Sequence, residues 1–98
     1  MLKEQIRQVI SEIVEVTDDL YQEKLNQGYN KLNSTLGKIM ELADKLFTLS
    51  RENKLVFEEQ RFLGNLTSAM KAMEEKDSVL LSDILVYEIG GQLLELIE

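Results

Sequence analysis

The stretch Val79–Ile97, VLLSDILVYEIGGQLLELI, predicts a helix with apolar residues on more than one face. Such a helix is usually buried against several neighbouring elements. Its main apolar series keeps steps of four residues: Leu81, Leu85, Ile89, Leu93 and Ile97. Because the pattern continues across Gly90-Gly91, we expect one helix over about 78–97, with Asp77 or Ser78 as its N-cap. The alternative is a helix that stops at Ile89 and is followed by a short tail.

Three further amphipathic segments precede this stretch. Apolar residues alternate at steps of three and four over about 2–25, 29–52 and 55–75, which is the pattern of helices with one buried face. Gly28 can adopt the left-handed conformation that ends a helix, so we place the first break there. A competing break lies at the capping cluster Thr17-Asp18-Asp19, and it would leave a short first helix and a much longer second one.

The four predicted helices have similar lengths and short connections, as an antiparallel bundle requires. The chain has 98 residues, 44% of them hydrophobic, and no proline, which fits a single helical domain. We therefore predict an all-α fold over residues 1–98, an antiparallel up-down-up-down four-helix bundle.

Charge and composition make several classes of function unfavourable. The net charge of −7 opposes binding to nucleic acid and to anionic membrane surfaces. No run of apolar residues is long enough to cross a bilayer. The chain has no cysteine, and its first residues, MLKEQIRQVISE, lack the apolar core and cleavage site of a signal peptide. These features predict a cytoplasmic protein.

The sequence lacks the residues that build most metal and catalytic sites. Without histidine or cysteine, zinc and copper sites and the di-iron pattern of helical bundles are excluded. One acidic cluster lies near the end of the first helix: Glu12, Glu15, Asp18, Asp19 and Glu23. It lacks the glycine-turned loop of a calcium hand, so we expect it to be a solvated helix surface. We therefore predict no metal, no cofactor and no enzymatic activity.

The most unusual polar residues are Asp83 and Glu88, which interrupt the apolar C-terminal helix on either side of Tyr87. We expect both carboxylates to point to water and to keep the helix from aggregating. One alternative is an ion pair with a lysine or arginine of another helix or subunit. A second alternative is general acid–base catalysis by Asp83, Glu88 or Tyr87.

Acidic and basic residues are distributed unevenly along the chain. From Asp77 to Glu98 there are five acidic residues and no basic one. Four lysines recur every seven residues: Lys24, Lys31, Lys38 and Lys45. We expect a solvated lysine stripe, with attraction between it and the last helix as the alternative, although exposed pairs contribute little. The functional interpretation is that the acidic last helix meets a basic patch on a partner protein.

The C-terminal helix also has more apolar residues than one buried face needs. Large exposed apolar patches mark partner surfaces. The candidate partner-binding residues are Val79, Asp83, Val86, Tyr87, Glu88, Gly90, Gly91 and Leu94. We expect an adaptor or chaperone-like module that holds a helix of another protein against this helix. The alternatives are a structural homodimer that covers the same face and, third, an enzyme.

The run Ala72–Glu88, AMEEKDSVLLSDILVYE, resembles a motif of a family of small uncharacterised bacterial helical proteins. In that motif an acidic turn precedes Asp-x-Val-Leu-Leu, a small residue, Asp-Ile-Leu and Tyr-Glu. The matching residues are Asp77, Val79, Leu80, Leu81, Ser82, Asp83, Ile84, Leu85, Tyr87 and Glu88. The family motif continues with a proline, whereas this chain has Gly90-Gly91. The resemblance implies a helical protein of the bacterial cytoplasm and carries no activity with it.

Overall fold

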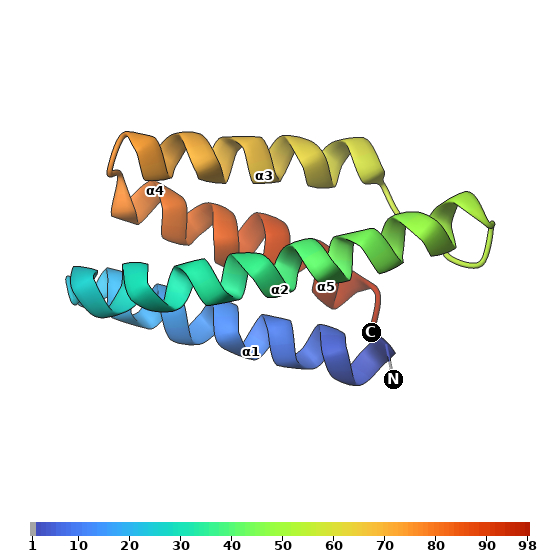
Figure 1. The fold of residues 1–98 in the computed structure, drawn as a ribbon, viewed down its shortest axis with the longest axis horizontal. Helices are drawn as coiled ribbons and strands as arrows, with labels where there is room; N and C mark the ends of the chain where they lie inside the picture. Colours follow the sequence, from blue (N-terminus) through green and yellow to red (C-terminus); the bar gives the residue numbers. More distant parts are fainter. Residues whose placement is uncertain (1) are drawn as a thin grey trace.

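The computed structural model describes residues 2–98, which form four antiparallel helical rods (Figure 1). Three rods are single helices: α1 (Leu2–Tyr21), α2 (Leu25–Arg51) and α3 (Glu59–Glu74). The fourth, which we name the C-terminal rod, joins α4 (Ser78–Asp83), the π-helical turn η1 (Ile84–Ile89) and α5 (Gly90–Glu95). Successive rods run in opposite directions, so the predicted all-α, up-down-up-down bundle is confirmed.

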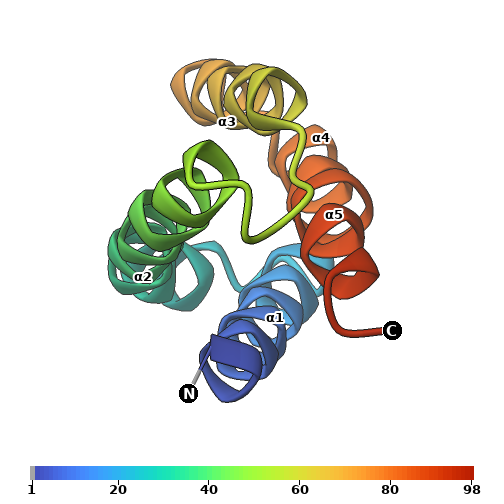
Figure 2. The ribbon, with the colours of Figure 1, turned by 90° about the vertical axis from the view of Figure 1, so that its right-hand side faces the viewer.

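Seen along its long axis, the bundle has one rod at each of four corners (Figure 2). The helix α1 packs against both α2 and the C-terminal rod, and α3 packs on the C-terminal rod. The large side chains with almost no exposure come from all four rods: Ile6, Ile13, Leu20, Leu32, Ile39, Leu42, Leu46, Phe62, Leu81, Leu85, Ile89 and Leu93. All of them lie in the four segments whose apolar periodicity predicted helices, so the buried faces of those helices form the core.

The first turn lies between the two breaks that the sequence suggested. The helix α1 ends at Tyr21 and α2 begins at Leu25. The predicted end of the first helix at residue 25 and the predicted start of the second at residue 29 are therefore wrong. Gly28 does not end a helix but is buried inside α2, where an added Cβ would lie 2.7 Å from Leu20 Cδ2. Its lack of a side chain lets the start of α2 approach the end of α1. The left-handed residue of this turn is instead Glu23, with φ 61°.

The other two turns also use a left-handed residue that is not glycine. Asn53 follows α2 with φ 57°, and Lys76 follows α3 with φ 55°. The five glycines, in contrast, all have negative φ. In this chain glycine therefore supplies space within helices rather than backbone freedom in turns.

The connection between α2 and α3 is longer than predicted. We expected a helix from residue 55, but α3 begins at Glu59 and residues 52–58 form a loop. The loop turns the Phe57 ring inward, 5.9 Å from the ring of Phe47 in α2 and 5.3 Å from that of Phe62 in α3. Because Phe57 reaches the core from this position, burial of its ring opposes the extension of α3 toward the N-terminus.

Gln92 fastens the end of this loop to the C-terminal rod. Its side chain is buried, and its Nε2 donates a hydrogen bond to the carbonyl oxygen of Glu58 over 3.0 Å. A buried hydrogen bond of this kind contributes about 1 kcal/mol, and losing one partner costs more because the other group is left without a partner.

The lysine stripe of α2 faces α1. Lys38 Nζ lies 2.9 Å from Glu12 Oε2, and Lys31 Nζ lies 3.1 Å from Glu15 Oε1 and 2.9 Å from Asp19 Oδ2. The pKa of Lys31 is raised mainly by its hydrogen bond to Asp19 and, to a smaller extent, by its hydrogen bond to Glu15. The alternative considered above, attraction of these lysines to the last helix of the same chain, is therefore wrong for Lys31 and Lys38. The acidic cluster of α1 is their partner instead, and within residues 2–98 no acidic group has the arrangement of a metal site.

The C-terminal rod continues through Gly90-Gly91, as we predicted, but it does so with one π-helical turn. An α-helix turns by about 100° per residue, so each step of four residues overshoots a full turn by about 40°. Four such steps would place Leu81 and Ile97 roughly 160° apart around the helix. A π-turn contains one more residue than an α-helical turn, so it reduces this accumulated rotation by about 100°.

The π-turn therefore keeps the four-step series in the core. Leu81, Leu85, Ile89 and Leu93 all have no exposed surface. The N–H of Gly90 donates to the carbonyl oxygen of Leu85, five residues earlier, and an added Cβ on Gly90 would lie 3.1 Å from that oxygen. Glycine at position 90 thus suits the closing bond of the turn.

The two glycines of α2 provide a pair of stability tests. Gly37→Ala should raise the free energy of unfolding by about 0.5–1 kcal/mol, because nothing lies within 4 Å of the added methyl group. Gly28→Ala should lower it by about 1 kcal/mol or more, because the methyl group overlaps the buried Leu20. Urea denaturation followed by circular dichroism measures both values. Equal gains for the two variants would contradict the close packing at Gly28.

A deletion tests the role of the π-turn. Removing Tyr87 shortens the step between Leu85 and Ile89 from four residues to three, which an ordinary α-helix accommodates. The shortened protein should keep its helical content and its cooperative thermal unfolding. The control is deletion of Glu15, an exposed residue of the regular helix α1, which turns Val16 and Leu20 out of the core and should abolish cooperative unfolding. Loss of folding in both deletions would show that the bundle needs the π-turn.

Candidate interaction surface

The register of the C-terminal rod places one set of residues on the side opposite the core. Each lies two positions before a buried residue of the four-step series, which is about half a turn away. We name this set the outer stripe: Val79, Asp83, Tyr87 and Gly91. Val79 is 59% exposed and Tyr87 is 71% exposed, whereas Asp83 and Gly91 are half-buried. Four of the candidate residues are therefore brought together on one face.

The remaining candidates lie elsewhere. Leu94 is exposed at the edge of the outer stripe, and Val86 is half-buried against the core. Gly90 is buried, with an added Cβ placed 4.0 Å from Ile13 Cγ2 of α1, so it faces the core and α1 rather than the outer stripe. The absence of a side chain at Gly90 leaves room for the backbone oxygen of Leu85 in the π-turn and for Ile13 of α1.

Glu88 lies on the other flank of the rod. It lines a groove of about 430 Å³ between α3 and the C-terminal rod, together with Asn65, Ser68, Lys71, Ala72, Glu75, Leu80 and Ile84. Asp83 and Tyr87 do not line this groove. The three side chains considered for acid–base chemistry therefore do not converge on one concave site.

Tyr21 is the residue that the sequence analysis missed. Its hydroxyl donates a hydrogen bond of 2.5 Å to Asp83 Oδ1, and this bond joins the end of α1 to the outer stripe. The hydrogen bond, helped by burial and by the negative charge of Asp83, raises the pKa of Tyr21 to about 12. In the sequence Tyr21 only widens the apolar face of the first helix, and nothing in that pattern relates it to a residue 62 positions away.

The acidic residues of the C-terminal rod are only partly paired. Asp77 caps α4, as predicted, by accepting a hydrogen bond of 3.0 Å from the N–H of Leu80. Glu95 lies 3.6 Å from Arg61 of α3. Among residues 2–98, Glu88 and Glu98 take part in no ion pair. The surface around the outer stripe therefore keeps an excess of negative charge.

The Tyr21–Asp83 hydrogen bond makes a prediction about alkaline pH. Asp83→Asn should bring the pKa of Tyr21 from about 12 back toward 10, because the carboxylate that holds the phenolic proton is gone. The tyrosinate absorbance measured against pH, with Tyr21→Phe to identify the residue, follows this change. The bond stabilises the folded protein fully below pH 10, and this stabilisation is lost as the pH rises through about 12. The difference in the free energy of unfolding between the parent and Tyr21→Phe should therefore vanish above about pH 12. Identical titration curves for the parent and Asp83→Asn would disprove the assignment.

Comparison with known proteins identifies a family but no activity. No helix among residues 2–98 is both long and apolar enough to cross a membrane. No curated protein and no solved structure matches the chain. A family model described as a domain of unknown function, DUF8042, matches residues 1–98, in agreement with the resemblance to an uncharacterised family. The chain therefore belongs to the DUF8042 family.

Proposed function

We propose that this protein is a non-enzymatic interaction module, adaptor or chaperone-like, that holds a helix of another protein against its outer stripe. The observation that carries the proposal is the exposure of two large apolar side chains, Val79 and Tyr87, on a rod whose core positions are already filled. Exposing such side chains together is unfavourable unless another surface covers them. Leu94 extends the apolar area at the edge of the stripe.

The π-turn supports the same proposal. A regular helix with a three-residue step between Leu85 and Ile89 would fill the same core position, so the extra residue is not needed for burial. Turns of this kind occur frequently at functional sites. Here the additional residue places Tyr87 in line with Val79 and Asp83, which gives the stripe its aromatic centre.

The charge of the rod indicates the chemistry of the partner. A carboxylate, Asp83, lies between the two apolar residues of the stripe. An amphipathic helix with apolar residues on one face and lysine or arginine beside them complements this surface. A second copy of the chain on the same stripe would bring Asp83 close to an identical carboxylate, which is unfavourable. The homodimer is therefore the second choice. We also propose a cytoplasmic setting, because the chain has no cysteine.

A synthetic helical peptide of leucine and lysine, patterned to be amphipathic, tests the proposal. Amide resonances of Val79, Asp83 and Tyr87 should shift on titration with this peptide. Changing both apolar residues, Val79→Lys and Tyr87→Lys, should weaken binding at the stripe at least tenfold, about 1.4 kcal/mol, through lost contact and added repulsion. Circular dichroism should show an unchanged fold, because both side chains are exposed.

Val56→Lys is the matched control. Val56 is an exposed apolar residue of the loop between α2 and α3, so this variant adds the same charge away from the stripe and should leave binding there unchanged. A leucine–glutamate peptide of the same pattern should bind more weakly. Unchanged resonances along the stripe would refute the proposal. A dimer in light scattering that Val79→Lys and Tyr87→Lys dissolve would show that a second copy covers the stripe.

A further inference from the structure

A second exposed apolar surface lies where α2 and α3 face each other. Two contacts near the loop identify the facing flanks: Arg51 Nη2 lies 3.1 Å from Glu59 Oε1, and the rings of Phe47 and Phe62 lie 6.2 Å apart. Residues seven positions apart share one flank of a helix. Met40 is seven residues before Phe47, so it lies on the flank of α2 that faces α3.

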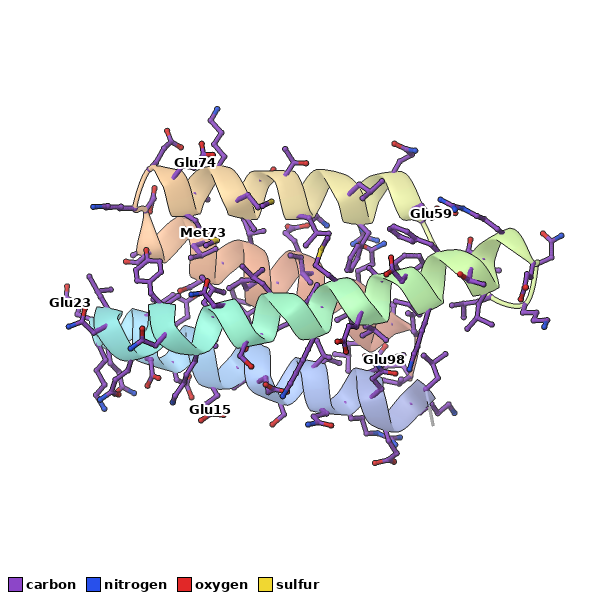
Figure 3. All side chains as sticks on the ribbon, viewed as in Figure 1. Glu15, Glu23, Glu59, Met73, Glu74 and Glu98 are labelled. Carbon is purple, nitrogen blue, oxygen red and sulfur yellow. The ribbon has the colours of Figure 1, made fainter. Side chains whose placement is uncertain are left out.

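The same reasoning places two residues on the opposing flank of α3. Leu63 follows Glu59 by four residues, and Met70 follows Leu63 by seven. We name the surface formed by Met40, Leu63 and Met70 the seam. Met40 is 55% exposed and Met70 is 59% exposed, and Leu63 is exposed beside them. In Figure 3 the labelled Met73, with its sulfur in yellow, lies between α3 and α2.

The packing of the bundle explains why the seam is open. The helix α2 packs chiefly on α1, and α3 packs chiefly on the C-terminal rod. Between them, Leu36 of α2 and Met73 of α3 are only half-buried against the core. The hydroxyl of Tyr29, also half-buried on α2, is shielded from solvent and has no hydrogen-bond partner among residues 2–98. The facing flanks of α2 and α3 therefore keep both apolar surface and an unused polar atom.

The charges beside the seam favour one kind of occupant. Glu74 lies one turn after Met70 and takes part in no ion pair among residues 2–98. Asp44, one turn after Met40, instead lines a groove toward α1 together with Lys45. The one basic residue on the facing flanks, Arg51, is already paired with Glu59. The lysines of α2 are turned toward α1, away from this surface. The α3 edge of the seam therefore carries an unpaired acid, Glu74, and a second copy would oppose like charges there.

We infer that the seam is a second docking surface, which takes an amphipathic helix of another protein with leucine-like residues on one face and lysine or arginine at its edges. Methionine side chains are flexible and polarisable, so they adapt to the irregular apolar face of such a helix. The seam lies between α2 and α3, whereas the outer stripe is on the C-terminal rod, across the bundle from α2 (Figure 2). The protein can therefore hold two helices at once on separate sides.

Methionine methyl NMR tests this inference directly. The methyl groups of Met40 and Met70 report the seam, and the amide of Tyr87 reports the outer stripe. With the leucine–lysine peptide as the probe, both methyl resonances should shift. Changing Met40→Lys and Met70→Lys should weaken binding at the seam at least tenfold, as read from the methyl group of Met73 and the amide of Leu63. The shifts of Tyr87 should remain as in the parent.

Met40→Leu and Met70→Leu form the conservative control, and this variant should bind at the seam within a few-fold of the parent. Val79→Lys and Tyr87→Lys should leave the seam titration unchanged, so the two surfaces succeed or fail independently. Methionine methyl groups that do not respond to the peptide would overturn the inference. Equal binding of the leucine–glutamate peptide would do the same, as would a dimer that Met40→Lys and Met70→Lys dissociate, because the occupant would then not be a basic helix.

Discussion

The C-terminal rod is shaped by a mismatch between its sequence and the geometry of the α-helix. Apolar residues recur every four positions, but an α-helix returns to the same face after 3.6 residues. The chain resolves the mismatch with one wide turn at Ile84–Ile89, closed by the bond from Gly90 to Leu85. Because α1 and α3 both pack on this rod, its register determines which faces of those helices are buried. The exposed side of the same register is the outer stripe.

A second constraint is the limited supply of basic residues. The chain has 11 basic and 18 acidic residues, and the lysines of α2 are used between α1 and α2. The charged residues on the other two sides of the bundle are mostly acidic. The two apolar surfaces, the outer stripe and the seam, both lie in these acidic regions. This charge distribution is the reason for proposing a basic, amphipathic helix rather than a second copy as the partner.

Much of the architecture could be predicted because hydrophobic periodicity reports helix and core together. The bundle, the identity of most core residues and the passage through Gly90-Gly91 all follow from that pattern. The turns could not be predicted as well, because Gly28 looks like a helix terminator and only the tertiary packing on Leu20 reveals its role. Phe57 was assigned to a helix for a similar reason, since its burial depends on Phe47 and Phe62.

The candidate surface was predictable only in part. Val79, Asp83, Tyr87 and Gly91 share a face because their spacing is four, which the sequence shows, but α-helical geometry alone would have separated them. Tyr21 and the seam depend on which flanks of different helices meet, and periodicity within one helix does not contain that information. The seam in particular needs the pairing of Arg51 with Glu59 to orient α2 and α3.

The backbone conformation of the turns bears on the stability of the folded protein. Glu23 and Lys76 hold the left-handed backbone that glycine adopts without cost, and for residues other than glycine and asparagine this conformation costs about 1 kcal/mol or more each. The bundle folds while carrying that strain in two of its three turns. The packing of its rods and core therefore has to offset that strain, which glycine in place of Glu23 and Lys76 would relieve.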